Sequence, residues 1–238
     1  MKFEIRTYSL VIVTITFVFF TIIGTISHEF GHIIVAKFLG HKTTLQYGSM
    51  TYERSNRYAN YEKIYSEYKH EIRNNLSYPK KAEFEKFQRR LKTESILITL
   101  GGPIQTTFTG LLGLLLLFLR RKQIRNTGLT HFDWLFVFMS LFWLRELFNI
   151  VVSISSGLIE GNGTYFGGDE AKISQYLELP IWTIGIVLGI IGLVSSIFVI
   201  FKIIPSRMRL TFISGGFIGG IIGFILWMKV IGPIILPC

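Results

Sequence analysis

Long runs of apolar residues constrain this 238-residue chain more than any other feature. The first run, over residues 8–39, holds no charged residue before Glu29. About 20 apolar residues are enough for a helix to cross the hydrocarbon core of a bilayer, and four more runs reach that length. We therefore expect an integral, multi-pass membrane protein of all-α class, located in the plasma membrane. The five expected spans are 8–39, 95–119, 132–158, 181–204 and 210–236.

The composition agrees with a membrane protein. Charged residues make up 17% of the chain, against about 25% in soluble domains. The net charge is +10, and region 41–94 alone holds twelve Lys or Arg against seven Glu. In a membrane protein, anionic lipid headgroups are the expected partner of these charges, and nucleic acid is not. Cys238 is the single cysteine, so the chain has neither an intrachain disulfide nor a cysteine-based metal site.

Region 41–94, between the first two spans, is expected to hold amphipathic structure. Alternating apolar residues predict a short β-hairpin at 43–53. Apolar residues at helical spacing predict a helix over 61–72, and Pro79 is expected to open a second. Such helices either lie on the membrane surface or pack on each other as a small pair. Because the region is too short for a separate domain, we expect one membrane domain over residues 1–238.

Two histidines and a glutamate interrupt the first apolar run, in the stretch HEFGH at 28–32. Ionisable groups inside a span cost a few kcal/mol each on insertion scales, so they indicate a functional role. Residues four apart share one helix face, with Cβ atoms about 5–6 Å apart, so His28 and His32 can bind one metal ion. Glu29 is rotated by about 100° and can act as a general base toward water at that ion. The alternative is a buried polar network that joins helices.

A zinc ion at these histidines needs a third protein ligand. Catalytic zinc keeps its fourth position for water, whose pKa falls to about 7. The stretch GNGTYFGGDEAKI carries Asp169 after two glycines, which allow a close backbone approach, so Asp169 is the preferred ligand. Glu170 and Glu160 are the runners-up, and Glu146 and His131 are the remaining candidates. The alternative role for Asp169 is to cap the helix predicted by DEAKISQYLEL.

Two charged residues, Arg145 and Glu146, lie in the middle of the third apolar run. Charges within spans face the bundle interior or a water-filled cavity. We therefore expect either a pair that fixes the bundle interior or two residues that line a substrate path, and we favour the pair.

Two motifs resemble the site-2 protease family, the intramembrane zinc metalloproteases. SHEFGHIIVAKFLG, at 27–40, resembles the first motif of that family. GGPIQTT, at 101–107, resembles its second motif, G-P-x-x-N. Thr106 stands in the place of the asparagine, and Gln105 is the candidate substitute for its polar role. The third motif, N-x-x-P-x-x-x-x-D-G, has no full counterpart, because Glu170 follows the aspartate.

The resemblance implies a function as well as a fold. It implies that His28, His32 and Asp169 bind Zn²⁺, that Glu29 is the catalytic base, and that the hairpin borders a substrate cleft. The expected protein is then an intramembrane zinc metalloprotease that hydrolyses peptide bonds in transmembrane or membrane-inserted segments. One alternative is a membrane zinc peptidase acting on small or lipidated peptides. Another is a non-catalytic scaffold of site-2 protease type.

Overall fold

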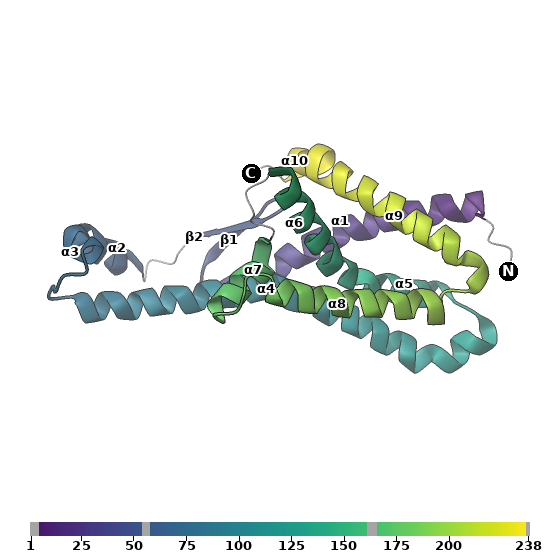
Figure 1. Ribbon diagram of the computed structural model, residues 1–238, viewed down its shortest axis with the longest axis horizontal. Coiled ribbons are helices and arrows are strands. Elements are labelled where there is room, and N and C mark those ends of the chain that lie inside the picture. Colours follow the sequence, from purple (N-terminus) through teal and green to yellow (C-terminus); the bar gives the residue numbers. More distant parts are fainter. Residues whose placement is uncertain (1–4, 54–57, 161–165, 237–238) are drawn as a thin grey trace.

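The computed structural model describes residues 5–53, 58–160 and 166–236, and its elements are mainly helices (Figure 1). Helix makes up 82% of the structure, which confirms the expected all-α class. The long helices are α1 (Thr7–Phe38), α4 (Lys81–Thr127), α5 (His131–Ser140), α6 (Leu144–Glu160), α8 (Thr183–Phe198) and α9 (Arg209–Ile225). The short elements are β1 (Lys42–Leu45), β2 (Met50–Glu53), α2 (Ala59–Glu67), α3 (Lys69–Arg73), α7 (Gly168–Tyr176) and α10 (Gly232–Ile235). Turns of 3₁₀ or π type are η2 (Leu141–Trp143), η3 (Val199–Ile203), η4 (Ser206–Met208) and η5 (Leu226–Ile231).

In the part of the chain that the structure describes, five helical segments are long and apolar enough to cross a membrane, as the sequence predicts. Large apolar side chains point outward from them, for example Phe108 on α4 and Phe217 on α9, which are 65% and 72% exposed. Such a surface is suited to lipid rather than to water. The chain is therefore a membrane protein. The five segments are Thr7–Phe38, Lys81–Thr127, His131–Ile159, Thr183–Ile203 and Ser206–Ile235.

Helix α4 is longer than its predicted span. Its 47 residues correspond to about 70 Å, more than twice the thickness of the hydrocarbon core. Its N-terminal part extends away from the other long helices, with α2 and α3 beside it (Figure 1). The prediction of a separate helix opened by Pro79 is wrong, because α4 begins at Lys81 and continues without a break into the span. No helix-breaking residue stands between Lys81 and the glycines at 101 and 102, so the helix has no reason to end there.

The projecting part of α4 carries a small apolar cluster of its own. Ile64 from α2, Tyr78 from the segment before α4 and Phe84 from α4 are buried together. The ring of Tyr61 stacks on that of Phe84, with centroids 4.9 Å apart. The helices of region 41–94 thus pack on each other, which is the second of the two expected arrangements.

The predicted β-hairpin is present. Strands β1 and β2 pair antiparallel, with Thr43 opposite Tyr52. The turn of the hairpin is held by the C-terminal end of the chain, because the Trp227 indole N–H donates to the Tyr47 carbonyl oxygen at 2.6 Å. The Tyr47 amide in turn donates to the Leu236 carbonyl oxygen at 3.2 Å. The hairpin is therefore fixed at both its base, after α1, and its tip.

Helix α1 lies at the centre of the bundle, between α9 and α4. A Cβ atom on Gly219 of α9 would lie 2.4 Å from the Thr14 carbonyl oxygen, so this glycine lets the two helices approach closely. Phe17 from α1 packs edge-on against Phe138 from α5 and against Phe212 from α9. This aromatic core fixes one half of α1 and leaves its other half, with the histidines, to α4 and α7.

Candidate metal centre

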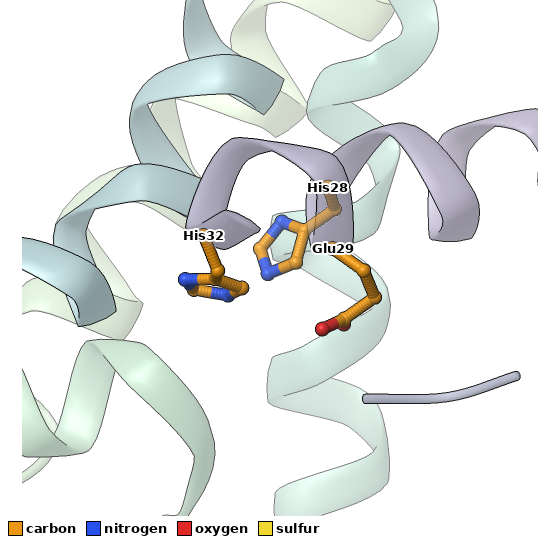
Figure 2. Close-up of side chains that lie close together, drawn as sticks. All are labelled: His28, Glu29 and His32. Carbon is orange, nitrogen blue, oxygen red and sulfur yellow. The ribbon is translucent and has the colours of Figure 1, made fainter. Parts of the chain in front are cut away.

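Three ionisable side chains lie on one turn of α1, well inside the expected span. His28, Glu29 and His32 are 1%, 6% and 6% exposed. Each offers a possible ligand atom, and these atoms lie within 4.8 Å of one another. Figure 2 shows the His28 and His32 rings next to each other, with the Glu29 carboxylate beside them. The helix itself, through its four-residue spacing, is what brings the two rings to one face.

Glycines let α4 cross α1 at the histidines. A Cβ atom on Gly31 would lie 2.3 Å from the Gly101 carbonyl oxygen, so the two helix backbones are in direct contact. A Cβ atom on Gly102 would lie 2.4 Å from Nε2 of His32 and 2.5 Å from Nε2 of His28. Gly102 therefore keeps clear the space beside both ring nitrogens, which a methyl group would fill.

Each histidine is oriented through its other ring nitrogen. Nδ1 of His28 lies 2.9 Å from the Thr106 hydroxyl, and Nδ1 of His32 lies 2.7 Å from the Ile98 carbonyl oxygen. A carbonyl oxygen only accepts, so the His32 contact requires a proton on Nδ1, and Nε2 is the nitrogen that faces Asp169. Partners of this kind fix the tautomer and the ring angle of metal-binding histidines. Both rings are thus held with Nε2 turned toward the same point.

The contact between Thr106 and the His28 ring is the polar role that the second motif predicts for this position. Gln105, the predicted substitute, instead donates from Nε2 to the Thr109 hydroxyl at 3.0 Å. The Ile98 carbonyl had no counterpart in the sequence analysis, because a backbone acceptor leaves no signal in residue type. The Gly-Gly pair before Pro103 is the one sequence signal that could have indicated the close crossing.

Asp169 completes the cluster from a distant part of the chain. Its Oδ2 atom lies 3.1 Å from Nε2 of His28 and 3.1 Å from Nε2 of His32. Helix α7 carries it, and Gly168, at φ 79°, adopts a backbone conformation that glycine favours where the chain turns into the site. Gly167 holds the N-cap position, so the alternative role of Asp169 as the cap of this helix is wrong. The helix itself begins where the sequence predicts.

The charge of Asp169 suits a ligand. Burial raises the pKa of this carboxyl group, but hydrogen bonds from His28 and His32 outweigh burial and hold the pKa well below its ordinary value. Lys172 lies one turn further along α7, with Nζ 3.8 Å from Oδ1, and is exposed. Asp169 is therefore an anion at neutral pH, and its second oxygen is the one nearest Lys172.

The other candidate ligands lie away from the two histidines or outside the described residues. Glu170 faces away from the histidines, and its Oε1 accepts from Nδ2 of Asn149 at 3.5 Å. His131 is exposed at the start of α5. It follows the C-terminal end of α4, and that end lies about 38 Å from Gly102 along α4. The side chain of Glu160 lies outside the described residues. Among the described carboxylates of other elements, Asp169 is the one in contact with both rings.

Arg145 and Glu146 do not form an ion pair with each other in the described part of the chain. The ion pairs of the described residues do not include one between them, and neither Glu146 oxygen has a hydrogen-bond partner there. Consecutive residues on a helix point about 100° apart, so they do not face each other. The expected role of these two residues in fixing the bundle interior stays a prediction.

The three side chains at the centre fit the donor set of a zinc ion. Zinc takes imidazole nitrogen at about 2.0–2.1 Å and carboxylate oxygen at about 2.0–2.2 Å in a tetrahedron. Donor atoms on such a tetrahedron lie about 3.3 Å apart, close to the 3.1 Å that separates Oδ2 from each Nε2. Gly102 supplies the clear space beside the two nitrogens. Two imidazoles and one carboxylate are also the number of protein ligands that a catalytic zinc ion takes.

Comparison with known proteins adds no assignment: the chain matches no protein-family model, no curated protein and no solved structure. Function therefore has to be argued from the residues themselves.

Proposed function

We propose that this protein is an intramembrane zinc metalloprotease. The observation that carries the proposal is the meeting of Asp169 Oδ2 with Nε2 of His28 and of His32, at 3.1 Å from each. Chance does not readily explain such a set in a membrane protein, because each ionisable group inside a span has an insertion cost. The sequence motif and this convergence come from separate parts of the chain, α1 and α7, and point to the same chemistry.

In this proposal His28, His32 and Asp169 hold the ion, and Glu29 handles the proton. Zinc, when bound, polarises the scissile carbonyl group and lowers the pKa of water to about 7. Glu29 takes the proton of the attacking water and passes it to the leaving amine nitrogen, as a general base and then a general acid. Thr106 and the Ile98 carbonyl keep the two rings from rotating during the cycle.

The substrate class follows from the depth of the site. His28 and His32 lie about 15 and 9 Å before the end of α1, so the site is reached from within the bilayer or from its near surface. A helical peptide bond is shielded by its own backbone, so a substrate has to be extended where it is cut. The hairpin β1–β2 directly follows α1 and offers a strand edge to such a segment. We therefore expect a transmembrane or membrane-inserted peptide or protein segment as substrate, and the plasma membrane as location.

The test compares the native chain with Glu29→Gln, on a membrane-spanning peptide in proteoliposomes and on a short soluble peptide. The matched control is Glu62→Gln, at an exposed position of α2. We expect Glu29→Gln to keep its zinc and to lose at least about 100-fold in cleavage rate, since a general base contributes at least that much. The control should keep both. Zinc without turnover of either peptide by the native chain favours the scaffold, and cleavage of the soluble peptide alone favours the small-peptide enzyme.

A further inference from the structure

A second buried polar cluster lies between α6 and α7, and Glu146 is its centre. The Glu146 side chain is 1% exposed, yet neither carboxylate oxygen has a hydrogen-bond partner among the described residues. An isolated carboxylate inside a membrane protein is costly, because desolvation of the charge is not repaid by any donor. The buried group therefore needs either a proton or a cation to balance its charge.

A second carboxylate lies beside the first. Glu170 on α7 is 5% exposed and lines the same small cavity as Glu146. Two carboxylates in one buried cavity repel each other when both are ionised, so a shared proton or a cation has to lie between them. Neighbouring Arg145 does not supply it, since no ion pair joins it to either carboxylate in the described part of the chain, and its own Nε is buried without a partner there.

The two carboxylates line one small cavity. Its walls carry two further polar side chains, Asn149 and Ser153 from α6, and are otherwise apolar. The cavity volume is about 10 Å³, enough for about one water molecule. Asn149 donates to Glu170 at 3.5 Å, and a half-turn of its amide would present oxygen to the cavity instead. The cavity therefore has room for one ion held by protein oxygens, without a hydration shell.

We propose that this cavity is a calcium site, formed by Glu146 and Glu170 with Asn149 and Ser153. The donors are all oxygens, which selects hard cations and disfavours zinc. Two carboxylates balance the charge of a divalent ion. Magnesium keeps several of its waters, and this cavity has no space for them. Because Glu170 directly follows Asp169, the ion would tie α7 to α6 and thereby steady the aspartate that faces the histidines.

The test measures Ca²⁺ binding to the full chain in detergent, after removal of divalent ions, by equilibrium dialysis with calcium chloride. We expect one Ca²⁺ per chain and a higher midpoint of thermal unfolding when calcium is added. Glu146→Gln should weaken binding by at least about tenfold. Two controls separate this site from the zinc centre: Glu67→Gln, at an exposed position of α2, and His28→Ala, which should lose zinc and keep calcium.

The opposite results are equally clear. If the native chain binds no calcium, or if Glu146→Gln binds it as the native chain does, the proposal is wrong. Absence of calcium binding together with a more stable Glu146→Gln would mean that the two carboxyl groups share a proton instead. Should Glu146→Gln fail to fold, Ser153→Ala at the rim serves in its place, with a smaller loss of calcium affinity expected. If the native chain binds calcium but no zinc, the proposed protease is refuted and the calcium site is not.

Discussion

Two buried polar clusters meet at α7, and they differ in how the protein satisfies them. In the cluster at His28, both rings have a partner on Nδ1 and a carboxylate on Nε2. In the cluster at Glu146, neither carboxylate oxygen has a partner among the described residues. The residues that join them, Asp169 and Glu170, are neighbours on one turn of one helix. The first cluster is oriented by protein groups alone, and the second is not.

The difference shows which features of a site the fold can build in advance. Orientation of the histidines comes from rigid helices, through the close crossing of α1 and α4 at Gly31 and Gly101. Such a site is set before any ion arrives, and fixed geometry is what a catalytic centre requires. The carboxylate cluster, in contrast, depends on an ion for its balance of charge. We therefore expect ion removal to loosen the contact between α6 and α7 more than that between α1 and α4.

The largest effect is expected from filling the space beside the histidines. Gly102→Ala would place a methyl carbon 2.4 Å from Nε2 of His32, so the rings or the helices have to move. We expect zinc affinity to fall by more than about 100-fold, with loss of any cleavage, as measured by metal content and peptide hydrolysis. Gly24→Ala on α1 is the matched control, because nothing described lies within 4 Å of its added Cβ. Equal zinc affinity in the two variants would mean that the space at Gly102 is not the metal position.

An intermediate effect is expected from removing the hydroxyl group that orients His28. The carboxylate of Glu146 has no such partner among the described residues. Thr106→Val keeps the shape of the side chain and deletes the hydroxyl that holds Nδ1 of His28. Loss of such an orienting partner weakens metal binding by about 10–100-fold, and we expect a value at the lower end of that range by competition with a zinc indicator. Thr107→Val is the control, since its hydroxyl bonds only to the Ile104 carbonyl of its own helix. The same loss in both variants would point to a general effect on α4.

The smallest effect is expected at the rim of the zinc cluster. Lys172 reaches Asp169 across 3.8 Å and is largely exposed, so water screens the pair. Exposed ion pairs contribute about 0–1 kcal/mol. Lys172→Gln should therefore change zinc affinity by less than about threefold in the same competition assay. A much larger loss would show that the charge of Lys172, and not the convergence of buried donors, sets the affinity.

The sequence predicted the features that depend on local spacing. Apolar runs identified the five spans, and the interval of four between His28 and His32 identified a shared helix face, because both depend only on helix geometry. The continuous α4 was not predicted, because the sequence indicates a separate helix opened by Pro79 before the apolar run at 95–119. The orienting role of Ile98 could not be predicted, since any residue supplies a carbonyl. The meeting of Glu146 with Glu170 was missed as well, because it depends on how α7 packs on α6.

The most direct test of the account is to locate the metal. The structure of the full chain, purified with zinc and determined at a resolution that identifies ligands, should show one ion bound by Nε2 of His28, Nε2 of His32 and a carboxylate oxygen of Asp169. Bond lengths of about 2.0–2.2 Å are expected. The account is contradicted if the two imidazole rings point apart, if zinc lies elsewhere, or if another residue takes the place of Asp169.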